Sequence, residues 1–220
     1  MGFCMVKMKL PFDTRRGGAT TASALDRLLA EIRDCRHCSP ALPLGPRPVV
    51  QAAESSRLLI IGQAPGRIVH ETAIAWNDPS GERLRNWIGV DRSRFYDPAQ
   101  VALVGMGFCY PGRAGNGGDA PPRPECAPLW HEQLFRHLVG VRLTLLVGSY
   151  AHAAYLRSRS GTLADRVRVY ASFPKGLFAL PHPSWRNNGW LARNPWFVKE
   201  TLPALRVQVQ TALDGDSDNR

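Results

Sequence analysis

Four short apolar segments, each followed by a loop rich in Gly, Pro or Ser, constrain the fold of this chain more than any other feature. They occupy residues 57–62, 101–105, 143–148 and 177–180. An apolar run of this length is typical of a strand that is buried on both faces of a parallel sheet. Amphipathic stretches lie at 81–90, 129–138, 149–157 and 195–213. This alternation predicts an α/β fold, a three-layer α/β/α sandwich around a central four-stranded parallel sheet.

The length and composition fit one folded domain. The 220 residues are 44% hydrophobic and 21% charged, which excludes disorder as the main state. Apolar residues between positions 25 and 32 recur at three- and four-residue steps, so a first helix is expected from residue 21 to about residue 35. We expect a loose leader over 1–20, a single domain over 21–213 and a solvated tail over 214–220.

Charge and hydropathy bear on the partner and the compartment. The apolar run at 58–61 is too short to cross a membrane, and no signal-peptide pattern begins the chain, so we expect a cytoplasmic protein without a membrane partner. The net charge is +10, and 24 of the 28 cations are Arg. The planar guanidinium suits phosphate and base edges, which is compatible with nucleic acid. GC-rich coding produces the same bias, so composition permits a polyanionic partner without requiring one.

Two loops are candidates for chemistry, because ligands bind at the carboxyl edge of such sheets. The GQAPG segment at 62–66 follows the first expected strand and can present backbone N–H groups to an oxyanion. An ordinary strand-to-helix turn is the alternative. The PHPS segment at 181–184 follows the last expected strand, and its two prolines fix the backbone around His182. A buried, satisfied histidine is the alternative there.

Together, the GQAPG and HPS segments resemble those of the uracil-DNA glycosylase superfamily. The register extends over about residues 22–210, and the layout from Gly62 through Trp76 to Gly81 is similar to motif A of the iron–sulfur branch, often called family four. The resemblance implies a DNA repair glycosylase. Such an enzyme flips a nucleotide out of the duplex and excises uracil or another deaminated base by hydrolysis of the N-glycosidic bond. DNA is then the partner, and we expect a monomer.

The cysteine spacing is similar to that of the same branch. Cys35 and Cys38 form a CxxC pair, and Cys109 and Cys126 follow after longer gaps. A disulfide framework is not expected in a reducing compartment. The resemblance implies that these four thiolates bind a [4Fe–4S] cluster, which would stabilise the fold because hydrolysis needs no redox change. A structural zinc fits the same residue types, and buried cysteines without a metal are the remaining alternative.

The resemblance also implies roles for individual residues. Trp76 aligns with the aromatic residue that stacks on the flipped base. His182 aligns with the histidine that hydrogen-bonds uracil O2 while negative charge grows on the departing base. The implied substrate contacts are Gly62, Ala64, Pro65, Gly66, Trp76, Asn116 and Ser184. Ser184, Trp185 and Arg186 would enter the minor groove and prop open the gap, and the implied DNA contacts are Arg67, Trp185, Arg186 and Asn187.

The chain departs from the family-four pattern at Gln63, at Gly105 and in the acidic stretch after motif A, which reads RIVHE at 67–71. Gln63 stands where those enzymes have Glu, and an amide cannot act as a general base, although it can orient water. His70 or Glu71 is then expected to supply the missing basicity, so the catalytic candidates are Gln63, His70, Glu71 and His182. Gly105 stands where an Asn is expected at the end of the second strand, so uracil selectivity does not carry over. Asn116 is the candidate for a later family asparagine.

Two other classes of function compete with the glycosylase. One is a binding module that keeps the fold to recognise damaged or single-stranded DNA without cutting the glycosidic bond. The altered motif A favours it, and the retained His182 opposes it. The other is an unrelated α/β hydrolase for a small molecule. The sequence has no GxSxG elbow and no GxGxxG after a strand, so acyl chemistry and a dinucleotide cofactor have little support.

Overall fold

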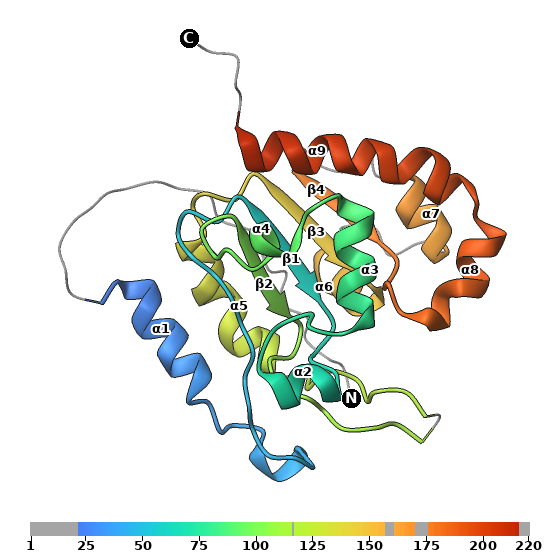
Figure 1. Cartoon of the computed structure of the whole chain (residues 1–220). Helices are drawn as coiled ribbons and strands as arrows, with labels where there is room; N and C mark the ends of the chain where they lie inside the picture. Colours follow the sequence, from blue (N-terminus) through green and yellow to red (C-terminus); the bar gives the residue numbers. More distant parts are fainter. Residues whose placement is uncertain (1–21, 116, 157–160, 170–175, 216–220) are drawn as a thin grey trace.

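A four-stranded, all-parallel sheet forms the centre of the molecule (Figure 1). The computed structural model describes residues 22–115, 117–156, 161–169 and 176–215, and within them the strand order is β2-β1-β3-β4. The strands are β1 (Leu58–Gly62), β2 (Val101–Gly105), β3 (Leu143–Val147) and β4 (Leu177–Leu180). The predicted α/β class and parallel sheet are confirmed, and each strand lies within one residue of its expected bounds.

Helices cover both faces of this sheet. They are α1 (Ala24–Arg33), α2 (Arg67–Thr72), α3 (Pro79–Ile88), α4 (Arg92–Phe95), α5 (Cys126–His137), α6 (Ser149–Tyr155), α7 (Leu163–Arg168), α8 (Asn188–Arg193) and α9 (Leu202–Asp214), with short 3-10 turns at Ser39–Ala41 and Trp185–Asn187. The expected 195–213 helix is divided into a π-helical segment, Phe197–Thr201, and α9. The short helices α2, α4, α7 and α8 were not predicted.

Local signals explain where the longer helices begin. Ser23 and Asp26 form a capping box at the start of α1, in which each side chain accepts a hydrogen bond from the other residue's backbone N–H. Asp78 caps α3 by accepting a 2.8 Å hydrogen bond from Gly81 N, and Pro79 occupies the first helical position. The helix that leads away from the GQAPG and Trp76 segment therefore has a fixed start.

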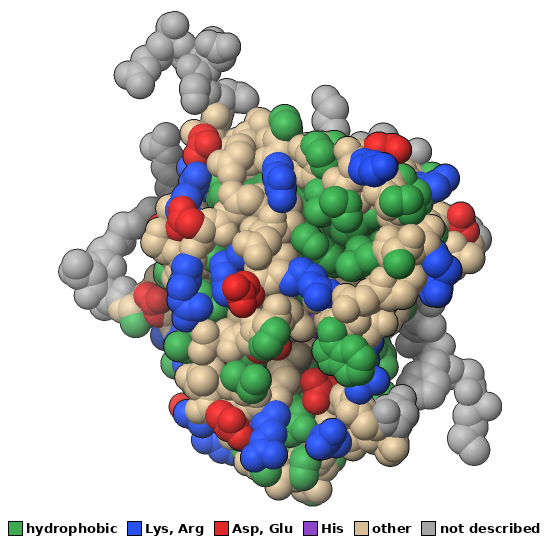
Figure 2. Space-filling view, turned by 45° about the vertical axis from the view of Figure 1, so that its right-hand side comes forward, with side chains coloured by type: hydrophobic (Ala, Val, Ile, Leu, Met, Phe, Trp, Pro, Cys, Tyr) green, Lys and Arg blue, Asp and Glu red, His purple; other side chains and the backbone are tan. Residues whose placement is uncertain are grey.

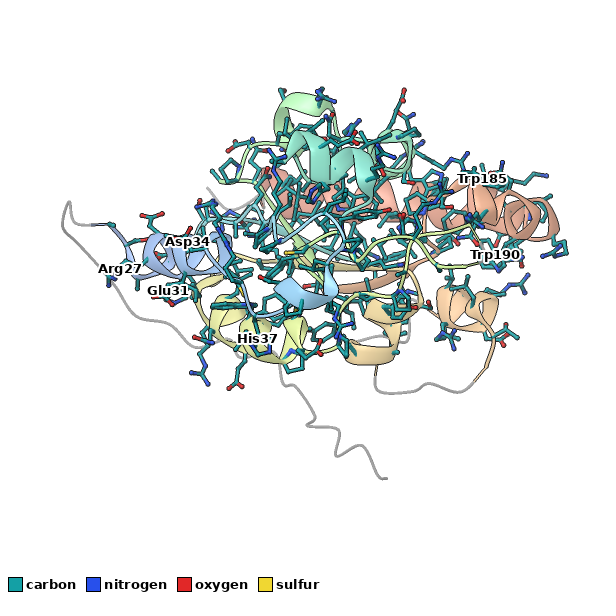
Figure 3. The ribbon with its side chains drawn as sticks, turned by 90° about the horizontal axis from the view of Figure 1, so that it is seen from below. Arg27, Glu31, Asp34, His37, Trp185 and Trp190 are labelled. Atoms are coloured by element: carbon teal, nitrogen blue, oxygen red, sulfur yellow. The ribbon has the colours of Figure 1, made fainter. Side chains whose placement is uncertain are left out.

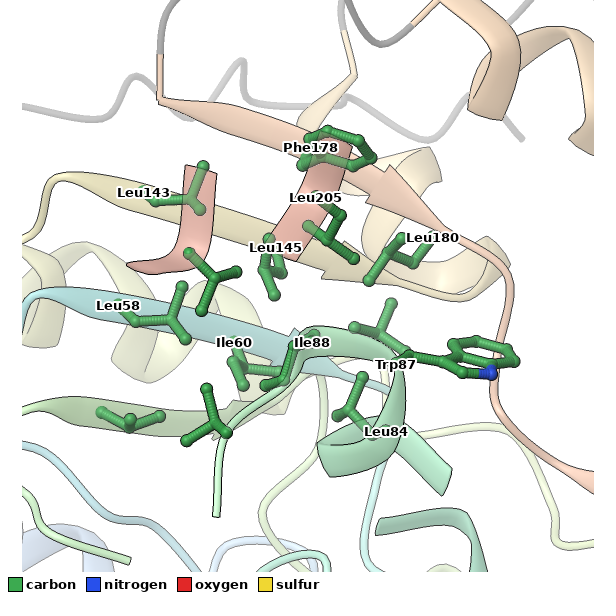
Figure 4. Close-up of a cluster of buried hydrophobic side chains, with 14 of the residues drawn as sticks. Leu58, Ile60, Leu84, Trp87, Ile88, Leu143, Leu145, Phe178, Leu180 and Leu205 are labelled. Carbon is green, nitrogen blue, oxygen red and sulfur yellow. The ribbon is translucent and has the colours of Figure 1, made fainter. Parts of the chain in front are cut away.

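Two apolar clusters lie on opposite faces of the sheet. Leu58 and Ile60 of β1 join the side chains of α3, α4, α7 and α9, as Figure 4 shows for part of this cluster. Leu59 and Ile61 point to the other face and join those of α1, α5 and α6. These four side chains are 0 to 2% exposed, and burying each one stabilises the fold by about 1.5–3 kcal/mol. The layers hold the carboxyl edge of the sheet in a fixed geometry.

The loops that follow β1 and β2 are joined at this carboxyl edge. Met106 N donates to Gly62 O at 3.0 Å, and Gly107 N donates to Gln63 O at 3.0 Å. The GQAPG segment is therefore held by backbone hydrogen bonds on one side and continues into α2 on the other.

The remaining expectations concern the ends of the chain and membranes. The predicted leader, 1–20, and residues 216–220 of the predicted tail lie outside the described residues. Within the described part of the chain, no helix combines the length and the apolar character that a membrane crossing requires.

Candidate active site

A cavity of about 520 Å³ opens at the carboxyl edge of the sheet, which is within the range of roughly 300–1,000 Å³ that is common for ligand pockets. The loops after β1, β2 and β4 all contribute to its lining, and so does the segment that leads into α3. Gln63, Trp76 and His182 line this cavity together, although they come from distant parts of the sequence. The predicted substrate residues Gly62, Ala64, Pro65, Gly66 and Ser184 also line it.

Trp76 is held in an unusual backbone conformation. Its φ of 56° lies in the left-handed region, which bulky residues rarely adopt. Two glycines make room for it: a Cβ at Gly81 would lie 1.7 Å from Trp76 O, and a Cβ at Gly62 would lie 2.6 Å from Trp76 Cζ2. Arg85 Nη1 donates to Trp76 O at 3.3 Å. The indole is therefore fixed over the end of β1.

His182 has a defined proton position. Burial lowers its pKa to about 4, so the imidazole is neutral at pH 7. Ser184 N donates to His182 Nδ1 at 3.2 Å, which leaves the single ring proton on Nε2. The ring stacks beside that of Trp76, with centroids 5.7 Å apart and planes 29° apart. His182 is therefore a hydrogen-bond donor next to an aromatic surface.

Comparison with known families gives one finding. The model of the Uracil DNA glycosylase superfamily matches residues 49–206. The chain belongs to this superfamily. The matched region contains the GQAPG loop, Trp76 and the HPS segment. It therefore includes every cavity-lining residue to which the sequence resemblance gave a role. Membership supports glycosylase-like chemistry on DNA.

The backbone of the segment that begins at His182 is held by side-chain hydrogen bonds, whereas its Trp185 side chain is exposed. Asn187 Nδ2 donates to His182 O at 2.7 Å, and Arg83 Nη1 donates to Ser184 O at 3.3 Å. Trp185 is 70% exposed, with the Arg186 guanidinium 5.1 Å from its ring centroid. Of the predicted DNA contacts, Trp185 and Arg186 line the cavity and Asn187 is not in its lining. Figure 3 shows Trp185 projecting at the side of the molecule opposite His37.

Two residues of α2 that were predicted to be catalytic are not in the cavity lining. Neither His70 nor Glu71 belongs to the cavity lining, whereas Arg67 does. Glu71 is exposed and forms a 2.8 Å ion pair with Arg67 Nε. His70 is buried, with its ring centroid 6.0 Å from that of Tyr110. Their positions give no support to a role in water activation. Asn116 lies outside the described residues.

Two carboxylates that the sequence analysis missed line the cavity. Asp78 caps α3, and burial raises its pKa. Asp119 belongs to the loop after β2 and forms a backbone bridge with Arg113. Burial and the nearby charge of Asp78 raise the pKa of Asp119. The Asn-Asp-Pro-Ser-Gly pattern indicates a helix cap, but neither residue carries a sequence signal for its place in the cavity.

Gly105 cannot be replaced by a larger residue without movement of the loop. A Cβ there would lie 2.4 Å from Gly107 O. The buried His131 of α5 makes a 2.9 Å hydrogen bond to Gly105 O through Nε2 and a 2.5 Å hydrogen bond to the Tyr155 hydroxyl through Nδ1. The close packing around residue 105 therefore leaves no room for a side chain.

The four predicted metal ligands line a second, much smaller cavity. Cys35, Cys38, Cys109 and Cys126 surround a space of about 20 Å³. Burial raises the pKa of Cys38 and Cys109, and it raises the pKa of Cys126 to about 12. Phe108 N donates to Cys126 Sγ at 3.3 Å. Across the described ranges, no group of three or more His, Cys, Asp or Glu side chains is arranged to hold a single metal ion.

These four thiols are of the residue type that binds an iron–sulfur cluster or a zinc ion, and they line one space. The thiolate forms of these cysteines repel one another. This repulsion adds to the effect of burial in raising the pKa of Cys38, Cys109 and Cys126. A shared positive centre would relieve this repulsion and the cost of burying the thiolates. A zinc ion requires each sulfur at about 2.3 Å, whereas a four-iron cluster accepts ligands that are further apart.

The surface charge is dispersed. Figure 2 shows Lys and Arg side chains spread over one face of the molecule, with Asp and Glu between them. Arg67, Arg113 and Arg186 line the active-site cavity. Asp78 and Asp119 line the same cavity, so its lining carries charges of both signs.

Proposed function

We propose that this protein is a DNA glycosylase that hydrolyses the N-glycosidic bond of uracil or another deaminated base. The neutral His182 carries the proposal, because it offers an Nε2–H donor beside Trp76 in a cavity of suitable size. Excision leaves negative charge on the departing base. A donor that is already in place stabilises that charge more than it stabilises the bound substrate.

Trp76 provides the surface on which the extruded base stacks. Aromatic faces hold flipped bases by stacking, and the fixed indole pays little entropy when the base arrives. The base edge then faces Gln63, whose amide can donate and accept. Since no side chain extends from Gly105, the proposal includes deaminated bases other than uracil.

Trp185 is the proposed wedge. An exposed apolar ring next to the cavity can enter the minor groove and unstack a base step, and Arg186 can contact the phosphates beside it. The hydrogen bonds from Arg83 and Asn187 hold the backbone of this loop. The wedge therefore loses little conformational entropy when it binds DNA.

We also propose that Cys35, Cys38, Cys109 and Cys126 hold a [4Fe–4S] cluster. When bound, it would tie the segment after α1 to the loop after β2 and to α5, which is a structural role. Four reduced thiols require a reducing compartment, so the proposal includes a cytoplasmic location. We propose a monomeric enzyme.

A lesion panel tests the proposed function. Single- and double-stranded oligonucleotides with uracil, hypoxanthine or xanthine are incubated with the protein, and alkali then cleaves any abasic site. We expect strand cleavage at one or more lesions, and cleavage that is about 10²-fold slower or more with His182→Ala. No cleavage anywhere, together with salt-dependent DNA binding, would replace the enzyme with a binding module.

A further inference from the structure

Two carboxylates flank the GQAPG loop inside the cavity. A Cβ at Gly66 would lie 3.3 Å from Asp119 Oδ2 and 3.9 Å from Asp78 Oδ2, so both side chains reach the same side of this loop. They arrive from different elements, because Asp78 precedes α3 and Asp119 belongs to the loop after β2. The cavity therefore contains carboxylate oxygens in spite of the amide at Gln63.

The two carboxylates differ in what they already bind. Asp78 Oδ1 accepts the 2.8 Å hydrogen bond that caps α3. The Asp119 side chain lines the cavity and accepts no hydrogen bond from the described residues. A group that holds a helix end is a poor proton carrier, since protonation would weaken the cap. Asp119 can change protonation state without that cost.

Hydrolysis of the glycosidic bond needs a proton acceptor near the sugar. Gln63 cannot take a proton, and His182 Nδ1 is occupied by the hydrogen bond from Ser184 N. His70 and Glu71 are not in the lining. We propose that Asp119 is the general base that activates the attacking water, an inference that rests on the proposed glycosylase function.

The proposed step balances as follows. The water oxygen forms a bond to C1′ of the sugar while its proton passes to an Asp119 oxygen. The C1′–N bond breaks, and its electron pair leaves with the base, whose oxygen accepts the hydrogen bond from His182 Nε2. The products are an abasic sugar with a hydroxyl at C1′ and the base as an anion, which takes a proton from solvent.

The charges around Asp119 suit this role. Burial and the carboxylate of Asp78 raise its pKa, while the guanidinium groups of Arg113 and Arg186 act in the opposite direction. Tyr110 also lines the cavity, and burial followed by the charge of Asp119 raises the pKa of its hydroxyl. A carboxylate whose pKa is raised is a stronger base than an ordinary aspartate.

Single-turnover excision by matched variants tests the proposal. Asp119→Asn should lower the rate about 10²-fold or more, with affinity for the product abasic duplex unchanged within about threefold. Asp119→Glu should restore part of the rate. The decline of the wild-type rate toward acid pH should be absent from the residual activity of Asp119→Asn. Glu132→Gln, which alters an exposed side chain of α5, is the control.

The outcomes separate this inference from the proposed function. An active wild type with an equally active Asp119→Asn would overturn the role of Asp119 and leave the glycosylase assignment intact. Equal losses of affinity and rate would assign Asp119 to DNA binding and also overturn it. A wild type that is inactive on every lesion would overturn both proposals.

Discussion

Replacement of His182 by Ala removes the donor on which the proposed chemistry depends. Loss of one preorganised donor to a developing negative charge costs about 10²- to 10³-fold in rate, or about 3 to 4 kcal/mol. The structure adds a dependence on pH. With a pKa of about 4, only about 1% of His182 is protonated at pH 6, whereas an ordinary histidine of pKa 6.5 would be about three-quarters protonated. The wild-type rate should therefore show no His182 titration between pH 5 and pH 8.

Single-turnover excision of the preferred base measures both effects. His182→Ala should lose rate at all pH values, with the affinity for product DNA little changed. His137→Ala, at the end of α5 and outside the cavity lining, is the matched control and should behave like the wild type. A wild-type rate that rises as pH falls through about 6.5 would mean that the imidazolium is the active form. That result would refute the neutral donor, as would a variant with wild-type rate.

Three further predictions concern stability and the cysteines. Gly81→Ala should lower the free energy of unfolding, measured in urea, by about 1–3 kcal/mol or more, because its Cβ would lie 1.7 Å from a backbone oxygen. Gly189→Ala is the control and should not be destabilised, since the nearest atom to its Cβ would be 3.6 Å away. The buried His131 and His152 both have pKa values lowered to about 4, so the unfolded state binds more protons below pH 6.5. The free energy of unfolding should then fall by about 2 kcal/mol per histidine between pH 7 and pH 5, and an unchanged value across this range would contradict the assignment. Anaerobically purified protein should be brown with absorbance near 400 nm, and Cys126→Ser should lower its iron content; a colourless protein with stoichiometric zinc would replace the cluster.

The sheet could be predicted from the sequence because its signal is local. Strands buried on both faces must be apolar throughout. The four consecutive apolar residues at 58–61 fit this pattern, and all four are buried. The short helices α2, α4, α7 and α8 gave no such signal, since one or two turns carry too few apolar residues to show a period. Their formation depends on tertiary packing and on caps such as that of Thr162 for α7.

The candidate site could be predicted only in part. Motifs identified Gln63, Trp76 and His182, and these residues share one cavity. Asp119 was missed because its place depends on the path of the loop after β2, which folds back on itself through the Arg113–Asp119 bridge and the hydrogen bond from Ala120 N to Gly112 O. His70 was expected near the reaction from its sequence position alone, yet the turn of α2 directs it to Tyr110. One helical turn is enough to separate a residue from a cavity that its neighbours line.

Two departures from the family-four pattern, Gln63 in motif A and Gly105 at the end of β2, are linked in the structure. Gly107 N donates to Gln63 O, and a Cβ at Gly105 would lie 2.4 Å from the carbonyl oxygen of the same Gly107. His131 fixes Gly105 from behind, so an amide at 105 would have to displace the peptide that positions Gln63. Among the described residues that line the cavity, Gln63 alone carries a side-chain amide. We infer that recognition of the base edge passes to Gln63, and proton acceptance must then come from another element, which is the role that Asp119 can fill.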